Sequence, residues 1–131
     1  DHAEHLVERC KRIEVQAGDI IARQGDSADT MHFILDGRIG IITELSDGHS
    51  IRVRSVGRNT TIGEMGFIAR RPRSATIQAE TASVLYELPA DSYEHIKTHN
   101  PAAAHALLSY VIEVMAERLN FASRTIGALQ R

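Results

Sequence analysis

The chain of 131 residues has one cysteine, no tryptophan and only 5% aromatic residues. The single thiol, Cys10, excludes an internal disulfide and a thiolate-rich zinc site, and it suits a reducing compartment such as the cytoplasm. Because aromatic residues are so few, the core of a domain of this length must be aliphatic. No apolar run approaches the length of a membrane span and no signal peptide opens the chain, so we expect no membrane insertion by this domain.

A strong net charge is also missing. The chain has 15 basic and 17 acidic side chains, which give a formal net charge of −2 with neutral histidines. That balance provides no long-range attraction for nucleic acid. The basic run Arg70-Arg71 lacks the interleaved aromatic residues of a nucleic-acid patch, so we expect both arginines to be solvated. No direct contact with nucleic acid is predicted.

Recognisable catalytic and metal motifs are absent as well. We find no Ser/His/Asp pattern, no Walker loop, no dinucleotide fingerprint and no pair of catalytic carboxylates. His95 and His99 are four residues apart and could share one face of a helix, but no third ligand is evident. The sequence therefore predicts no enzyme activity, no metal ion and no cofactor.

What the chain does have is a series of short strand patterns separated by turns. Apolar residues alternate between Met31 and Glu44, and Asp36-Gly37 interrupts the alternation with a turn or bulge. The predicted common face of this segment carries Met31, Phe33, Leu35, Ile39 and Ile41. Further strands are expected to begin at residue 13 and to cover about 20–26, 51–54, 75–79 and 84–88. Many short strands at this spacing predict a sandwich or barrel rather than a doubly wound sheet.

Helical patterns flank these strands. Residues 1–12 predict a short amphipathic helix, and a second short helix is expected from about residue 89 to 96. Asn100-Pro101 is a helix start signal, and apolar residues then recur every three or four positions to about Leu129. Such a helix would be about 43 Å long, more than one small domain can cover. Its apolar stripe is expected to meet the ligand, a second copy or an attached segment.

These patterns predict one domain over residues 1–131, with strands over about 13–88 and C-terminal helices over about 89–130. The chain opens at Asp1 rather than at a methionine. We therefore expect it to be part of a longer protein.

The most informative stretch is Gly63 to Phe67 together with Arg73. The odd-numbered residues of 73–79 share one strand face, so Arg73 should point inward, where a guanidinium needs an anion nearby. The glycines let the backbone approach a ligand, and free N–H groups at a short helix start attract negative charge. Glu64 would repel that charge unless the ligand also offered a hydroxyl, as a ribose does. An anion close to a hydroxyl indicates a nucleotide phosphate on its sugar.

This stretch resembles the phosphate-binding cassette of cyclic nucleotide-binding domains. The family pattern is Gly-Glu-apolar-small-apolar, five further residues, and then Arg-small-Ala-small, and residues 63–67 and 73–76 match it at that spacing. The turns at Gly25-Asp26 and Asp36-Gly37 also stand in the expected places. The resemblance implies a mainly β fold, a jelly-roll β-barrel of about eight strands. It also implies one short N-terminal helix and two C-terminal helices, the last of which is a lid over the base.

The resemblance also assigns roles to individual residues. Arg73 would pair with the cyclic phosphate, and Glu64 would accept a hydrogen bond from the ribose 2′-hydroxyl. An internal ion pair between these two side chains is the alternative. The implied phosphate and ribose site is Gly63, Glu64, Met65, Gly66, Arg73, Ser74 and Ala75. The implied base pocket and lid are Ile41, Val53, Arg54, Ala122 and Ser123.

The function implied is a non-enzymatic cytoplasmic regulatory domain that reports ligand binding through its last helix to an attached effector. Relatives that favour cGMP often have threonine where this chain has Ser74, so we expect cAMP. The apolar stripe of the last helix also suggests a homodimer. Residues 116–126 are similar to the end of domains fused to SulP-type anion transporters, which would tether the domain at the cytosolic face of the membrane. A relative that binds nothing and acts as a dimerisation or interaction module remains an open alternative.

Overall fold

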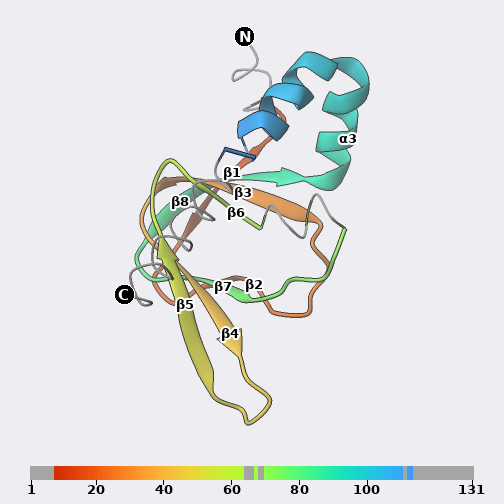
Figure 1. Cartoon of the computed structure of the whole chain (residues 1–131). Helices are drawn as coiled ribbons and strands as arrows, with labels where there is room; N and C mark the ends of the chain where they lie inside the picture. Colours follow the sequence, from red (N-terminus) through yellow and green to blue (C-terminus); the bar gives the residue numbers. More distant parts are fainter. Residues whose placement is uncertain (1–7, 64–66, 68–69, 111, 114–131) are drawn as a thin grey trace, which may run out of the picture.

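The computed structural model of the chain describes residues 8–63, 67, 70–110, 112 and 113. Within these residues the strands form two antiparallel four-stranded sheets, which Figure 1 shows as two layers. The first sheet contains, in spatial order, β1 (Lys11–Val15), β8 (Ser83–Pro89), β3 (Thr30–Asp36) and β6 (Thr61–Ile62). The second contains, in spatial order, β2 (Ile20–Ala22), β7 (Thr76–Ala79), β4 (Ile39–Glu44) and β5 (Ser50–Val56). The mainly β class predicted from the sequence is confirmed.

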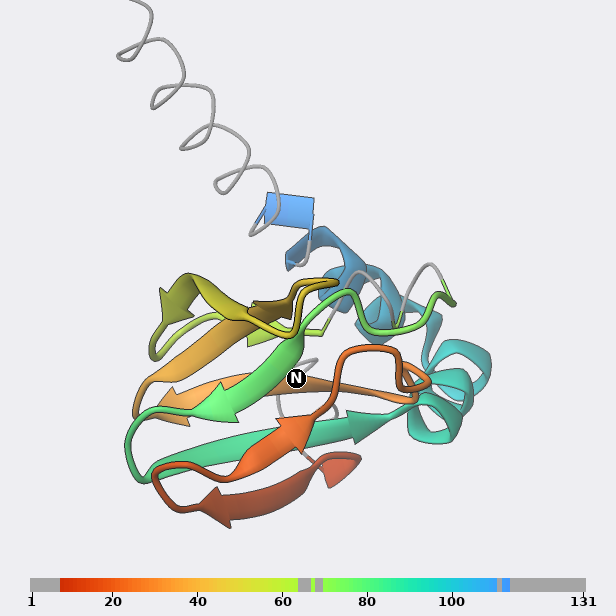
Figure 2. The same ribbon diagram turned by 90° about the horizontal axis from the view of Figure 1, so that it is seen from below.

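Figure 2 shows the two sheets from below. An aliphatic core lies between them. Ile34 and Leu85 enter it from the first sheet, and Ile39 and Ile77 enter it from the second, each at most 4% exposed. Removal of these side chains from water is the main contribution to the packing of one sheet on the other. In the described residues the sheets remain two separate layers, so they form a sandwich rather than the closed barrel that was expected.

Strand β3 is covered on both faces. Met31 and Phe33 point outward and pack in a second apolar cluster beneath the helices, whereas Ile34 points inward to the sandwich core. Gly37, with φ at +101°, then turns the chain into β4, and Ile39 lies in the inner core with Ile34. The predicted common face of Met31, Phe33, Leu35, Ile39 and Ile41 is therefore wrong. The turn at Gly37 exchanges the two faces.

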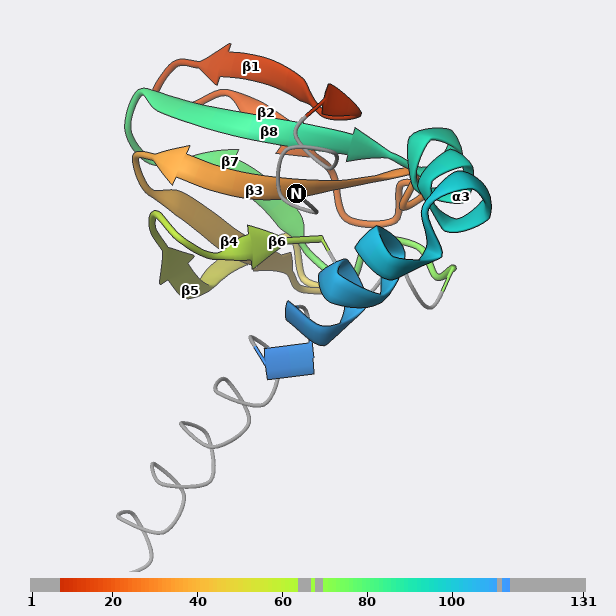
Figure 3. The same cartoon turned by 90° about the horizontal axis from the view of Figure 1, so that it is seen from above.

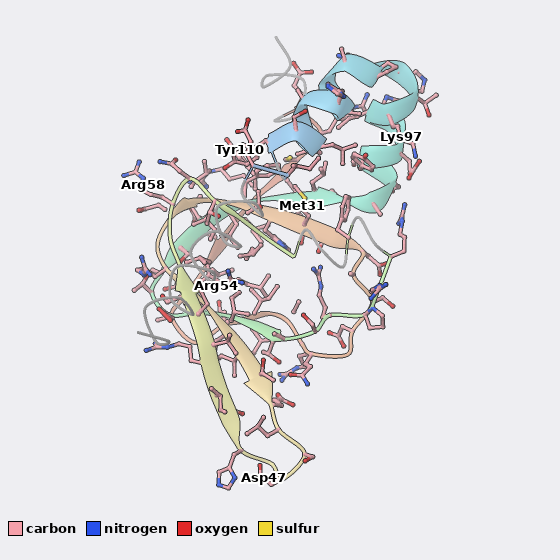
Figure 4. The ribbon with its side chains drawn as sticks, in the orientation of Figure 1. Met31, Asp47, Arg54, Arg58, Lys97 and Tyr110 are labelled. Atoms are coloured by element: carbon pink, nitrogen blue, oxygen red, sulfur yellow. The ribbon has the colours of Figure 1, made fainter. Side chains whose placement is uncertain are left out.

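Two helices pack on the outer side of the first sheet at the end where β3 begins and β8 ends, and Figures 1 and 3 show them at that end. Helix α3 (Ala90–His99) follows β8 directly, and residues 101–110 form the next helix. The Asn100 side-chain oxygen accepts a hydrogen bond from the backbone N–H of Ala103 at 3.2 Å, which confirms the predicted helix start. Ile96 and Leu107 belong to one buried cluster with Met31, which Figure 4 labels below the helices. The predicted continuation from residue 114 to 129 lies outside the described residues.

The remaining boundaries differ modestly from prediction. Strand β1 begins at Lys11, so a helix through residue 12 is too long, while residues 1–7 lie outside the described part. Strand β2 ends at Ala22 because the Asp26 side chain caps a turn at the N–H of Arg23 at 3.2 Å. Asn59, in the turn between β5 and β6, has a left-handed conformation, with φ at 64°. No helix in the described part of the chain is both long enough and apolar enough to cross a membrane.

Replacement of Leu85 tests the sandwich core. Leu85 is 0% exposed and lies on β8, which has a neighbouring strand on each side. Leu85→Ala should lower the free energy of unfolding by about 2–5 kcal/mol, because it removes buried methyl groups and leaves a cavity. Leu35→Ala is the matched control, since Leu35 is 38% exposed. Urea denaturation with equal midpoints for the two variants would contradict this core.

Candidate functional site

Arg73 is buried, with 6% of its surface exposed, and its guanidinium is held by oxygen atoms from two other segments. Its Nη2 donates to the carbonyl oxygen of Thr30 at 2.6 Å and to the Thr30 hydroxyl at 3.0 Å. Its Nη1 donates to the carbonyl oxygen of Gly63 at 3.2 Å. Thr30 begins β3 and Gly63 follows β6, and both strands belong to the first sheet. Arg73 precedes β7 of the second sheet, so its hydrogen bonds join the two sheets. The predicted inward orientation of Arg73 is confirmed.

The backbone of Arg73 is fixed as firmly as its side chain. Its N–H donates to the carbonyl oxygen of Asp26 at 2.8 Å, and its carbonyl oxygen accepts from the N–H of Gly25 at 2.8 Å. Gly25 has φ at +90°, a conformation that glycine adopts without steric cost. The turn after β2 therefore sets the position from which the guanidinium extends.

Gly63 lies directly against the guanidinium. Its φ is +77°, and a Cβ at this position would collide with Nη1 of Arg73 and lie 3.3 Å from its Cζ. The same Cβ would be 3.5 Å from the carbonyl oxygen of Thr30. Glycine is thus required here both for the backbone conformation and for space, and the neighbour that requires it is Arg73. The predicted close approach of this backbone to a ligand stays a prediction.

The other predicted phosphate and ribose residues are only partly described. Ser74 is exposed and Ala75 is half-buried, and both follow Arg73 immediately before β7. Glu64, Met65 and Gly66 lie outside the described residues, so their expected roles, including the ion pair between Glu64 and Arg73, stay predictions.

The cassette segment is joined to helix α3 by two side chains. Phe67 is 3% exposed and meets Tyr93 edge to face, with ring centroids 5.5 Å apart and an interplanar angle of 71°. Arg70 donates from Nη2 to Oε1 of Glu94 at 2.9 Å. Arg70 is exposed to solvent, as predicted, but its ion pair with Glu94 was not predicted. The partner could not be found from the sequence, because Glu94 is 24 positions away.

The predicted base-pocket residues lie on two neighbouring strands of the second sheet. Ile41 on β4 and Arg54 on β5 stand opposite each other in register, and Figure 4 marks Arg54. Ile41 is half-buried, whereas Arg54 is exposed and Val53 is 62% exposed. The register shifts between Ile41 and Ile42, so Val53 falls at an irregularity of the pair. Ala122 and Ser123 lie outside the described residues.

The histidine pair and the cysteine are explained without a metal. The rings of His95 and His99 stack at 4.1 Å between centroids, and Nδ1 of His99 donates to the His95 carbonyl oxygen at 3.0 Å. Among the described residues no group of three His, Cys, Asp or Glu side chains is placed to hold a metal ion. Burial raises the pKa of Cys10 to about 11, so this thiol stays protonated at neutral pH.

A buried histidine next to this site was not predicted from the sequence. His32 on β3 is 1% exposed, and its Nε2 lies 3.1 Å from Oε1 of Glu87 on β8. Its Nδ1 is buried and has no hydrogen-bond partner in the described part of the chain. Burial lowers the pKa of His32, the charge of Arg73 lowers it further, and Glu87 raises it. The sequence does contain one indication of its location: His32 is two residues after Thr30, so both side chains lie on the same face of the strand.

Residues 12–100 of the chain match the family model described as "Cyclic nucleotide-binding domain". The chain is 32% identical over 94 residues to human patatin-like phospholipase domain-containing protein 6, which covers 72% of this chain and 7% of that protein. It is also 32% identical over 99 residues to a cyclic nucleotide-gated potassium channel of Rhizobium etli, which covers 76% of this chain and 26% of the channel.

A solved structure gives the same result for the fold. A cyclic nucleotide-binding domain from Methylobacillus flagellatus is similar with a TM-score of 0.88 at 21% identity, over 95% of this chain and 70% of that one. At this identity the likeness shows a shared fold. Because the chain spans only 7% of the phospholipase and 26% of the channel, the activities of those whole proteins are not established for it.

The buried histidine gives a pH dependence of stability that can be measured. Burial lowers the pKa of folded His32 below its ordinary value of 6.5, so below about that pH the unfolded chain binds a proton that the folded chain does not. Stability should therefore fall as the pH falls, with a contribution from this residue of at most about 1.4 kcal/mol per pH unit. His32→Gln should show a shallower fall in urea denaturation between about pH 7 and pH 5. Equal slopes for parent and variant would contradict this assignment.

Proposed function

The chain belongs to the cyclic nucleotide-binding domain family, and from that premise we propose that it binds cAMP as the regulatory part of a larger protein. The observation that carries this proposal is the geometry of Arg73. Its buried guanidinium stands where the cassette pattern requires it, held in one orientation by Thr30 and Gly63. The fold itself is that of a cyclic nucleotide-binding regulatory domain.

The neutral oxygens around Arg73 orient its charge, and a phosphate monoanion would complement that charge. In a site shielded from water, a charge-assisted hydrogen bond between guanidinium and phosphate is stronger than it would be in water. Gly63 adds a backbone that a ligand can approach closely, since it carries no Cβ. These features favour a small anionic ligand over a protein surface as the partner of Arg73.

We assign the rest of the ligand contacts on the same basis. Glu64 accepts from the ribose 2′-hydroxyl, the N–H groups of Gly63 and Gly66 face the phosphate, and Met65 and Ala75 complete the loop around it. Ser74, which is exposed next to Arg73, offers its hydroxyl to the ligand. Its place in the family pattern favours cAMP over cGMP.

The base is proposed to lie along strands β4 and β5. Ile41 provides an apolar surface there, and Arg54 stands opposite it in register. Val53, on the same strand, keeps most of its surface exposed and is available for contact. Ala122 and Ser123 would close over the base from the last helix.

Ligand binding is proposed to reach an effector through the helices. Phe67 belongs to the buried cluster that includes Ile96 of α3 and Leu107 of the following helix. A change in the loop that carries Phe67 must therefore alter the packing of both helices. A ligand shifts such an equilibrium only if it binds one arrangement more tightly than the other. The last helix is also the surface that we propose for a homodimer.

The relatives named above are a patatin-like phospholipase domain-containing protein and a cyclic nucleotide-gated potassium channel, so they give no support to an anion-transporter host. We favour a cytoplasmic domain, tethered at the membrane where its host spans it. The second candidate, an interaction module that binds no nucleotide, is disfavoured by the ordered geometry around Arg73.

Loss of the guanidinium should abolish nucleotide binding. Arg73→Ala removes the charged partner of the phosphate, and we expect a loss of about 2–5 kcal/mol in binding free energy, measured by calorimetric titration with cAMP. Arg71→Ala is the matched control, because Arg71 is exposed in the same loop. Since Arg73 also joins Thr30 to Gly63, thermal unfolding must establish that the variant is folded at the titration temperature. A folded Arg73→Ala chain that binds cAMP as the parent does would refute the phosphate assignment.

The ribose contact is tested by pairing one variant with one analogue. Glu64→Gln should weaken cAMP binding less than Arg73→Ala, because an amide oxygen still accepts a hydrogen bond. The parent should bind 2′-deoxy-cAMP more weakly than cAMP, and the Glu64→Gln chain should discriminate less between them. Equal affinity of the parent for both nucleotides would exclude the contact with Glu64.

A further inference from the structure

A row of polar side chains crosses the inner face of the first sheet and ends beside Arg73. Lys11 on β1 stands opposite Glu87 on β8, and Glu87 stands opposite His32 on β3. Opposite residues of antiparallel strands project from the same face, so the three side chains are neighbours. Burial increases along the row: Lys11 is exposed, the Glu87 side chain is 27% exposed and the His32 side chain is 1% exposed.

The buried end of this row lies within the segments that hold the guanidinium. His32 is two residues after Thr30, so both side chains project from the same face of β3. On its other side His32 stands opposite Ile62 of β6, which immediately precedes Gly63. Thr30 and Gly63 are the two residues whose oxygens accept the hydrogen bonds of Arg73. The imidazole is therefore packed directly behind the site proposed for the phosphate.

One nitrogen of the His32 ring also lacks a hydrogen bond. Nε2 meets the Glu87 carboxylate, but Nδ1 is buried and has no hydrogen-bond partner in the described residues. A buried polar atom without a partner costs free energy, so its presence next to a ligand site calls for a role. Because its neighbour Glu87 is a carboxylate, the ring can accept a proton and remain paired.

We propose that His32 couples ligand binding to proton uptake: a phosphate anion bound at Arg73 draws a proton onto the buried ring, which Glu87 then stabilises. This inference rests on the proposed function, because it takes the anion to be the nucleotide phosphate. It adds to the site a neighbouring residue, His32, whose protonation changes when an anion binds at Arg73.

The direction of the effect follows from the charges that face the ring. Arg73, from the segment before β7, opposes protonation, whereas Glu87, from β8, favours it. Lys11 flanks Glu87 from β1 and is exposed, and β6 contributes the uncharged Ile62. A phosphate bound at Arg73 adds a negative charge close to the ring, and this charge opposes the effect of Arg73, so the bound chain holds a proton on His32 more firmly than the free chain does. Affinity must then rise as the pH falls.

The experiment is a calorimetric titration of the chain with cAMP between about pH 8 and pH 5.5, the range in which histidine titrates and most carboxylates do not. Titrations in two buffers of different ionisation enthalpy count the protons taken up. We expect affinity to increase several-fold toward the lower pH, with net proton uptake. Each unit by which the pKa of the ring rises on binding corresponds to about a tenfold gain.

Variants identify the group that takes up the proton. His32→Gln should bind with an affinity that no longer depends on pH in this range. His49→Gln is the control, because His49 is exposed at the hairpin tip beside Asp47, which Figure 4 marks far from the helices. It should keep the parent's pH dependence. If His32→Gln does not fold, Glu87→Gln provides the second test, and it should reduce proton uptake. Proton uptake that persists in His32→Gln, or a parent whose affinity is independent of pH, would overturn the inference.

A ligand-free measurement separates this inference from the proposed function. The NMR titration of the His32 ring should move to higher pH in Arg73→Gln, because the repelling charge has been removed. If the parent binds cAMP but the His32 titration is unmoved in Arg73→Gln, the proton linkage alone is contradicted. Absence of cAMP binding by the parent at every pH contradicts the proposed function, and with it the claim that the nucleotide draws the proton.

Discussion

The structure depends on one cation that joins its two sheets. Arg73 emerges from the loop before β7 in the second sheet, and its guanidinium donates to oxygens of Thr30 and Gly63 in the first. At 6% exposure this side chain has lost most of its water, so each missing hydrogen bond would leave a desolvated donor. These contacts hold the guanidinium in one orientation, and they fasten the loop before β7 to Thr30 of β3 and to Gly63 after β6.

Much of this site could be predicted from local sequence, because its constraints are local. The alternation after Arg73 predicts its inward orientation. Gly63 was predicted to let the backbone approach a ligand, and the close approach that the structure shows is to the guanidinium of Arg73. Thr30 could not be predicted as the acceptor, because it is 43 positions away and any residue offers a carbonyl oxygen. The ion pair of Arg70 could not be predicted for the same reason, since its partner Glu94 lies on α3.

The fold shows where periodicity succeeds and where it fails. The turn after Asp36 and the helix start at Asn100 were predictable, because each depends on the chemistry of one or two residues. The face of β3 was not, because apolar residues lie on both of its faces: Met31 and Phe33 belong to one cluster and Ile34 to the other. For the same reason the burial of His32 was not predicted, since alternation could not assign this residue to an exposed or a buried face. The pattern along the chain also does not show its partner Glu87, which is 55 positions away.

Two side chains join the cassette segment to α3, and they differ in strength. The ion pair of Arg70 with Glu94 is exposed on both sides, and such pairs contribute roughly 0–1 kcal/mol. Phe67 is 3% exposed, and truncation of a buried phenylalanine costs about 3–5 kcal/mol. The burial of Phe67 in the cluster that also contains Ile96 and Leu107, rather than the ion pair, therefore provides most of the attachment of this segment to the helices.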